Sequence, residues 1–421
     1  MALAIQEPTD SGCCDVASSA VDDGSSLVTL YPRRTWESKW WWYYATITGT
    51  NGRTLNLDIA VADARNGISL TFRNGFWSYS ADGPWHNWDS VGTQTSPDRI
   101  RFTKSSAFDQ DTIHVAYYPV LSWGQTEAII ETWKESEFVF PTISGDADLI
   151  VGTVAEDTTS FGRTCPAANL YGFMITDSAA VGPKNKGLLV SGVHPGETPG
   201  SHGLNAAVEF LLSDDPLAVI LRTYWEWYIY PNVNPQGRYG GLYRNSPDVG
   251  VNVDWNRIWG GGTSDVVDDW RTVIDADTEG EINFYCDFHC YNFDYGGGSD
   301  FLDTALQWQP TGLKNAEFAS LYVANYDSAF NWISWGGGIT GTTAQWVEAN
   351  LDNAGSLKVS MTSESQSRAA ATLADYQLFG ERIVKACADS TVSGGIFPVQ
   401  AEADEGDPIR REARIGYKRV A

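Results

Sequence analysis

Two hydrophobic patterns follow one another along the chain. From about residue 27 to residue 140, short aromatic and β-branched runs are separated by Gly, Asn and Asp, as where Trp40–Thr48 and Thr54–Ala62 flank a turn at Thr50–Gly52. Strands with this spacing predict an antiparallel β-sandwich. From about residue 143, apolar runs alternate with helical stretches, which predicts a layered α/β domain with a largely parallel or mixed sheet.

The second pattern predicts individual elements. Its expected strands are Leu149–Val154, Gly187–Val193, Thr223–Pro231, Ile282–Phe288 and Leu357–Thr362. Its expected helices are Ser201–Leu212, one that starts at Thr304–Ala305, Leu313–Tyr326 and Thr372–Ala388, and a helical connection near Trp123–Pro141 precedes them. The predicted division is an N-terminal arm (1–26), a β-sandwich domain (27–140), an α/β domain (141–395) and a charged C-terminal tail (396–421).

Composition and charge limit the classes of partner. Hydrophobic residues make up 43% of the chain, which is enough for a large core. The formal charge of −25 argues against nucleic acid, and no window approaches the roughly 20 apolar residues of a membrane span. The N-terminus lacks a basic segment followed by an apolar one, so a secretory signal is not expected. These features predict a cytoplasmic protein, with carriage in a larger particle such as a virion as the alternative.

Candidate metal ligands follow the strand expected at Gly187–Val193. It leads into His194 and Glu197 in a Pro/Gly turn, and the helical stretch Ser201–Leu212 comes next. Open α/β sheets bind ligands at strand ends, and a His and a Glu three residues apart can bind one metal ion. The pair alone is a weak signal, because such spacing also arises by chance.

Further polar residues occur at later strand ends and in the segment 230–259. Arg244 and the pair Asn256–Arg257 are suited to bind an anion, and the carboxylate of Asp254 can orient a metal-bound histidine. His289 ends one expected strand and Glu364 ends the last one.

The cysteines offer a different metal site. Six in a chain of 421 residues are too few to indicate a disulfide framework. Cys286 and Cys290 flank His289, so a Cys/His zinc site is considered, but without a C-x-x-C pair, buried thiols are preferred.

Taken together, these pieces resemble the zinc metallocarboxypeptidases of the carboxypeptidase A type. The motifs that carry the resemblance are HPGET, NPQG, R-N-S, V-D-W-N-R-I-W, D-F-H and a late strand ending in Glu, in that family's order. The cytosolic carboxypeptidase branch is most similar, since it also uses HPGET and places a β-sandwich directly before the catalytic domain. The resemblance implies an α/β fold with a mixed-sheet, zinc carboxypeptidase-like catalytic domain preceded by an all-β sandwich.

The resemblance also implies the role of each site residue. His194, Glu197 and His289 would hold Zn²⁺ and leave a fourth position open for water. Glu364 would be the general base for the zinc-activated water, and Arg244, preferred to Arg238 for its spacing to Asn256, would stabilise the oxyanion. The remaining roles fall to neighbouring residues: Asn256 and Arg257 would bind the substrate's terminal carboxylate, and Asp254 would orient a ligand. The expected function is a hydrolase that removes C-terminal residues from peptides or proteins.

One stretch departs from the family pattern. Family members usually carry a mobile Tyr in a Gly-rich loop that also lines the specificity pocket, and the matching stretch Asn331–Trp346 has no Tyr. Trp332 and Trp335 are the candidates to cover the substrate instead. The stretch also has no charged residue, which favours neutral or apolar C-terminal side chains.

Two other functions stay open. A zinc amidohydrolase of the aspartoacylase type uses the same kinds of metal ligand but acts on small acylated amino acids. A structural or surface-binding component of a larger assembly could retain the peptidase fold and grip a surface with the Trp-rich sandwich, although strand tryptophans are expected more often in a core or between domains.

Overall fold

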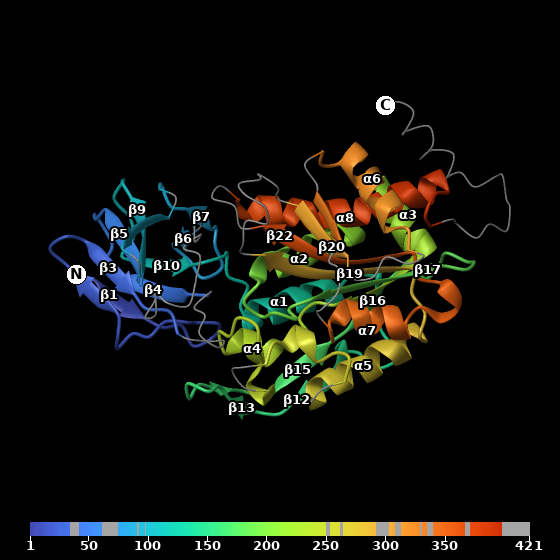
Figure 1. Ribbon diagram of the computed structural model, residues 1–421, viewed down its shortest axis with the longest axis horizontal. Coiled ribbons are helices and arrows are strands. Elements are labelled where there is room, and N and C mark those ends of the chain that lie inside the picture. Colours follow the sequence, from blue (N-terminus) through green and yellow to red (C-terminus); the bar gives the residue numbers. More distant parts are fainter. Residues whose placement is uncertain are drawn as a thin grey trace.

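The chain folds into an N-terminal part with two small sheets and a C-terminal part built around one large sheet, and the two parts lie side by side (Figure 1). A computed structural model describes residues 1–33, 42–60, 75–90, 92–96, 98–249, 253–261, 264–291, 303–307, 313–328, 331–334, 340–366 and 371–397. No helix within these ranges combines the length and the apolar character that crossing a bilayer requires.

In the described N-terminal region, ten strands form two five-stranded sheets. The first has the order β1 (Ala4–Gln6), β4 (Tyr44–Thr48), β10 (Thr112–Ala116), β6 (Phe76–Ser78) and β7 (His86–Asn87). The second has the order β2 (Ala20–Asp22), β3 (Leu27–Leu30), β5 (Leu55–Ala60), β9 (Arg99–Lys104) and β8 (Thr93–Ser96). β3 and β5 are parallel, and the other pairs are antiparallel.

The two small sheets share one hydrophobic core. Ile47 and Ile113 of the first sheet are buried with Leu57 and Phe102 of the second. Strand β9 shows how the sequence dictates this, because its alternate residues Ile100 and Phe102 are buried while the residues between them are partly exposed. The predicted β-sandwich is confirmed. Its described tryptophans at 42, 77, 85 and 88 are buried, as expected for core residues.

The first 26 residues, expected to form an arm, contribute two short strands to the sandwich. β1 pairs with β4 and β2 pairs with β3. The Ser11 backbone N–H donates to the Tyr239 carbonyl at 2.8 Å, and Arg163 donates to the Gly12 carbonyl. This segment is therefore tied to both parts of the molecule. The domain boundaries themselves stay predictions, and residues 398–421, most of the expected tail, lie outside the described ranges.

As far as the described residues show, eight strands form the large sheet. Their order is β11 (Val139–Pro141), β16 (Phe173–Ile175), β18 (Trp225–Tyr230), β17 (Asn185–Ser191), β19 (Phe284–Tyr291), β22 (Val359–Gln366), β20 (Asp303–Gln307) and β21 (Asn331–Ser334). β18, β17, β19 and β22 are parallel neighbours at the centre, whereas β16 and β20 join them antiparallel. The sheet is mixed, as predicted.

Helices cover both faces of the large sheet (Figure 1). One face packs against α2 (Thr198–Leu212), α3 (Pro216–Tyr224), α6 (Asn315–Asn325) and α8 (Leu373–Ser393). The other packs against α5 (Asp265–Thr278) and α7 (Thr343–Asn350). α1 (Trp123–Lys134) begins with a capping box at Ser122 and forms the predicted helical connection, and α4 (Pro235–Tyr239) is a short helix capped by Asn234.

Two expectations need correction. The helix expected from Thr304–Ala305 is wrong, because these residues lie in β20, which pairs antiparallel with β22. Hydrogen bonding to the sheet outweighs the helix propensity of this short run. The strand expected at Leu149–Val154 exists as β12 (Ile150–Val154), but it pairs with β15 (Ala168–Tyr171) in a separate two-stranded sheet. A second small sheet joins β13 (Asp157–Thr158) to β14 (Thr164–Cys165).

Arg238 joins the two parts of the molecule from a buried position. Its guanidinium donates to the Leu121 carbonyl at 2.7 Å and to the Ser201 hydroxyl at 2.8 Å. Leu121 lies in the connection after the sandwich and Ser201 lies in α2. Only 2% of Arg238 is exposed, so these hydrogen bonds through Nη1 and Nη2 offset part of the cost of burying its charge.

Replacement of Arg238 by alanine should therefore destabilise the fold. We expect Arg238→Ala to lower the free energy of unfolding by about 3 kcal/mol, because two hydrogen bonds to a charged group are lost and their acceptors stay buried. Arg53→Ala, which removes a surface ion pair with Asp23, is the control and should cost about 1 kcal/mol or less. Urea unfolding followed by circular dichroism measures both, and equal losses would contradict the proposed importance of Arg238.

Candidate active site

The candidate metal ligands lie at the carboxyl ends of neighbouring parallel strands. β17 ends at Ser191 and leads directly into the turn that carries His194 and Glu197. β19 carries His289 near its end, and β22 carries Glu364 directly beside it, since His289 and Glu364 are paired in the strand register. Strand ends of this kind hold the ligand sites of α/β sheets.

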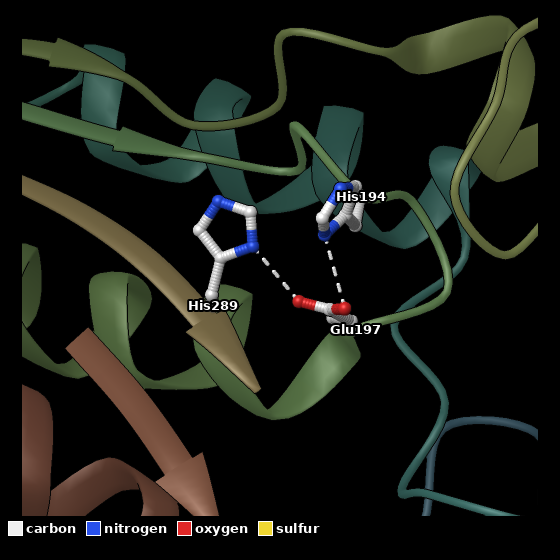
Figure 2. Close-up of side chains that lie close together, drawn as sticks. All are labelled: His194, Glu197 and His289. Carbon is white, nitrogen blue, oxygen red and sulfur yellow. Dashed lines mark hydrogen bonds and ion pairs between the residues drawn. The ribbon is translucent and has the colours of Figure 1, made fainter. Parts of the chain in front are cut away.

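The two histidines converge on the carboxylate of Glu197 (Figure 2). His194 Nδ1 lies 3.0 Å from one carboxylate oxygen, and His289 Nδ1 lies 2.8 Å from the other. One ligand atom from each residue falls within 4.8 Å of the others. No more than 3% of any of these three residues is exposed, so a metal ion held between them would be shielded from bulk water.

A second carboxylate fixes the outer side of each imidazole. His194 Nε2 lies 2.9 Å from Asp254, the candidate orienting carboxylate, and His289 Nε2 lies 2.8 Å from Asp287. An N–H donated from Nε2 to these carboxylates would leave the lone pair of Nδ1 free for a metal, which is the tautomer that a ligand requires. Sequence reasoning missed Asp287, although its position two residues before His289 on a strand places both side chains on one face.

Two glycines permit the close packing that assembles the site. A Cβ on Gly200, in the first turn of α2, would lie 2.4 Å from the Phe288 carbonyl oxygen, so only glycine lets the helix reach β19. Gly192, which follows β17, has φ +77°, a conformation that glycine adopts without strain. The approach of α2 to β19 also lets the Cys290 backbone N–H donate to Glu197 at 3.1 Å.

The charges in the site favour an ionised Glu197. Burial acts against a charged carboxylate, but His194 and His289 hold the pKa of Glu197 well below its usual range. Burial likewise opposes a charged imidazole, whereas Asp287 and Glu197 raise the pKa of His289 well above its ordinary value. An ionised Glu197 is the form that can bind a metal ion, whereas His289 would have to release its proton to bind one.

Glu364 differs from Glu197 in its environment. Burial raises the pKa of its carboxyl group, and 7% of the residue is exposed. One of its carboxylate oxygens is buried without a hydrogen-bond partner among the described residues. A buried carboxylate with a raised pKa and an unsatisfied oxygen beside a metal-binding group has the properties of a general base.

The anion-binding candidates surround Asp254. Arg244 donates to Asp254 through Nε at 3.1 Å and Nη2 at 2.9 Å, and its Nη1 donates to Glu197 at 3.2 Å. The Asn256 side-chain oxygen accepts two hydrogen bonds from Thr343, which turns the amide N–H₂ to the other side. Arg257 follows in the turn η3 (Trp255–Arg257), and 32% of its side chain is exposed, so a ligand can reach it.

The remaining candidates lie apart from this group or cannot be compared with it. Arg238 binds Leu121 and Ser201 instead of the ligand group, so Arg244 is the arginine beside Glu197. Trp332 lies in β21, and Trp335 lies outside the described residues. All six cysteines are described, and each is buried and outside any disulfide. Within the described segments, Cys286 and Cys290 join no group of three potential ligands, as the preference for buried thiols predicted.

Comparison with known proteins identifies the segment that carries most of this site. The sequence profile of the family described as zinc carboxypeptidase matches residues 156–291, which include His194, Glu197, Arg244, Asp254 and His289. This segment is part of a zinc carboxypeptidase domain. The family resemblance inferred from the motifs is thereby confirmed.

Curated relatives of this zinc carboxypeptidase domain include cytosolic carboxypeptidases. Cytosolic carboxypeptidase 6 of Caenorhabditis elegans is 28% identical over 213 residues, which cover 47% of this chain and 42% of the relative. Cytosolic carboxypeptidase 6 of Homo sapiens is 40% identical over 84 residues, which cover 20% of this chain and 16% of the relative. The chain thus matches less than half the length of these relatives.

Solved structures share the fold of nearly the whole chain. A metallo-carboxypeptidase from Burkholderia cenocepacia has a TM-score of 0.70 at 16% identity and covers 93% of this chain and 100% of its own. A metallo-carboxypeptidase from Pseudomonas aeruginosa, in complex with (2-guanidinoethylmercapto)succinic acid, has a TM-score of 0.69 at 16% identity and covers 92% of this chain and 98% of its own. The carboxypeptidase-like α/β fold and the preceding sandwich are therefore shared with known proteins.

Asp287 should strengthen metal binding through His289. We expect Asp287→Asn to weaken Zn²⁺ affinity by about tenfold to a hundredfold, because the imidazole loses the carboxylate that fixes its tautomer. Asp277→Asn is a matched control. Asp277 is also buried, but it lies in α5 and accepts a hydrogen bond from the Tyr230 hydroxyl instead of contacting a metal-ligand candidate. Competition with a chromophoric chelator measures both affinities, and an unchanged affinity in Asp287→Asn would contradict this role.

Proposed function

We propose that the protein is a zinc-dependent carboxypeptidase that removes C-terminal residues from peptides or proteins. The observation that carries the proposal is the convergence of His194, Glu197 and His289 at strand ends, with Glu364 beside them. The match of residues 156–291 to the zinc carboxypeptidase family supports the same conclusion.

The donor set of the site fits zinc. Two imidazole nitrogens and one carboxylate are a combination that Zn²⁺ takes in catalytic sites with three protein ligands. His194, Glu197 and His289 would hold the ion through Nδ1 atoms and the carboxylate, because Asp254 and Asp287 occupy both Nε2 atoms. Zinc bound there supplies a Lewis acid that acidifies a water molecule and polarises the scissile carbonyl.

Glu364 is proposed to move the proton. Its unsatisfied oxygen would accept a proton from the attacking water and then deliver it to the nitrogen of the leaving amine. Burial raises its pKa, which makes it a stronger base than an exposed glutamate. The balance is that of hydrolysis, since the C–N bond breaks, a C–O bond forms and the proton ends on the amine.

Arg244 and Arg257 are proposed to stabilise two negative charges of the substrate, one on the attacked carbonyl oxygen and one on the terminal carboxylate. Arg244, which already lies 3.2 Å from Glu197, would stabilise the charge that develops on the carbonyl oxygen. Arg257 and the amide N–H₂ of Asn256 would bind the terminal carboxylate of the substrate. A substrate held by its terminal carboxylate is cleaved one residue from its end, which gives an exopeptidase.

Replacement of Glu364 tests the reaction. We expect Glu364→Gln to lower kcat by about a hundredfold to ten-thousandfold with zinc still bound, because the proton acceptor is lost while the ligands stay. Glu317→Gln, on the exposed face of α6, should leave kcat unchanged. Mass spectrometry of a peptide mixture reports release of single C-terminal residues, and a chelator should abolish it.

The same assay separates the alternatives. N-acyl amino acids are offered beside the peptides, and their hydrolysis without any peptide cleavage would point to the amidohydrolase. Zinc binding with no turnover of either substrate class would contradict the proposed activity and favour a binding role.

A further inference from the structure

Two buried serines stand at the two ends of the turn that carries His194 and Glu197. The Ser191 and Ser201 hydroxyl oxygens lie 3.1 Å apart, and each residue is at most 1% exposed. Ser191 is the last residue of β17, and Ser201 lies in the first turn of α2. Their contact therefore joins the strand that enters the turn to the helix that leaves it.

The groups on either side of the two serines fix the direction of the hydrogen bonds. Arg238 Nη2 donates to the Ser201 hydroxyl at 2.8 Å, and the Ser191 hydroxyl donates to the Pro231 carbonyl oxygen at 2.5 Å. A hydroxyl has one proton to donate, so Ser201 is the donor in the contact with Ser191. We call this series, from Arg238 through Ser201 and Ser191 to the Pro231 carbonyl, the serine network.

The charge of Arg238 strengthens the serine network. Burial lowers the pKa of Arg238 to about 10, so the guanidinium stays protonated at neutral pH. A charged donor makes a stronger hydrogen bond than a neutral one, and it polarises the hydroxyl that accepts it. Ser201 is therefore a better donor to Ser191 than it would be without Arg238.

The turn between the serines is held at two places. His194 lies three residues after Ser191, and Glu197 lies four residues before Ser201. The Gly196 backbone N–H donates to the Tyr243 carbonyl at 3.1 Å and fixes the middle of the turn. The hydrogen bond between the serines fixes its base, so it helps to set the separation of the two candidate ligands.

We propose that Ser191 and Ser201 are positioning residues of the zinc site, and that Arg238 acts on the site through them. The proposal rests on the carboxypeptidase function above, because it concerns the zinc ligands of that function. Arg238 Nη1 also donates to the Leu121 carbonyl at 2.7 Å, in the segment that joins the β-sandwich to α1. The serine network thus connects that segment to the base of the ligand turn.

Removal of the serine hydroxyls tests this role. We expect Ser191→Ala and Ser201→Ala each to weaken Zn²⁺ affinity by about threefold to tenfold, which corresponds to the loss of one hydrogen bond. Because both act through the same contact, the double variant should lose less than the sum of the two single losses in free energy. Competition with a chromophoric chelator measures the affinities. Additive losses, or an unchanged affinity in both single variants, would overturn the proposal.

Ser390→Ala is the matched control. Ser390 is also fully buried, and its hydroxyl oxygen accepts a hydrogen bond from the Ile396 backbone N–H at 2.8 Å near the end of α8. Its replacement should leave Zn²⁺ affinity unchanged. A loss of affinity as large as that of Ser201→Ala would assign the effect to general destabilisation and overturn the positioning role.

The visible spectrum of the Co²⁺-loaded protein gives a second readout, because it reports the geometry of the metal ligands. We expect the absorption bands to shift in Ser191→Ala and Ser201→Ala and to stay unchanged in Ser390→Ala. Arg238→Ala should weaken Zn²⁺ affinity at least as much as Ser201→Ala, and a wild-type affinity there would contradict the part assigned to Arg238.

Neither readout depends on turnover, so the two proposals can fail separately. Wild-type protein that binds Zn²⁺ and cleaves no peptide would reject the carboxypeptidase function alone. Peptide cleavage by the wild type, with unaltered Zn²⁺ affinity and Co²⁺ spectra in both serine variants, would reject the positioning role alone.

Discussion

The buried carboxylate of Glu197 holds the candidate site together. One of its oxygens lies 3.0 Å from His194 Nδ1 and accepts a hydrogen bond from Arg244, and the other lies 2.8 Å from His289 Nδ1 and accepts one from the Cys290 backbone N–H. These groups come from a turn, a loop and a strand that are far apart in the sequence. A carboxylate buried to this extent is tolerated only when it is fully paired, so the position of each segment depends on the others.

The β-sandwich packs behind this group. Tyr118, in the segment that follows β10, belongs to the same buried cluster as Tyr243 and Cys290, and Cys290 is the neighbour of His289. His202 of α2 is buried, with 8% of it exposed, and its Nε2 lies 3.2 Å from the Pro119 carbonyl oxygen. Burial lowers the pKa of His202 to about 4, so it is a neutral packing residue. The sandwich therefore supports α2 and β19, the two elements that present the ligands.

The sequence predicts those features that depend on neighbouring residues or on a periodic hydrophobic pattern. His194 and Glu197 stand three apart after an apolar run, and this local pattern was enough to propose a metal site. The β-sandwich and the parallel centre of the large sheet followed from strand alternation and spacing. Asp287 was within reach of the same reasoning, because residues i and i+2 of a strand share a face.

Features that depend on tertiary contacts were not predictable. β20 has a helix-compatible sequence, and its pairing with β22 decides its structure. α7 was not expected, because it begins inside a glycine-rich stretch. Glu348, Ser360 and Tyr285 lie near one another because α7 packs over β19 and β22. The spacing of these residues in the sequence does not reveal that packing.

X-ray absorption spectroscopy of the zinc-loaded protein tests the central claim most directly. If His194, Glu197 and His289 hold the ion, the spectrum should show nitrogen and oxygen ligands at about 2.0–2.1 Å and no sulfur at about 2.3 Å. Replacement of His289 by alanine should remove the bound zinc. Sulfur ligands, or full zinc content in His289→Ala, would contradict the assignment of this site.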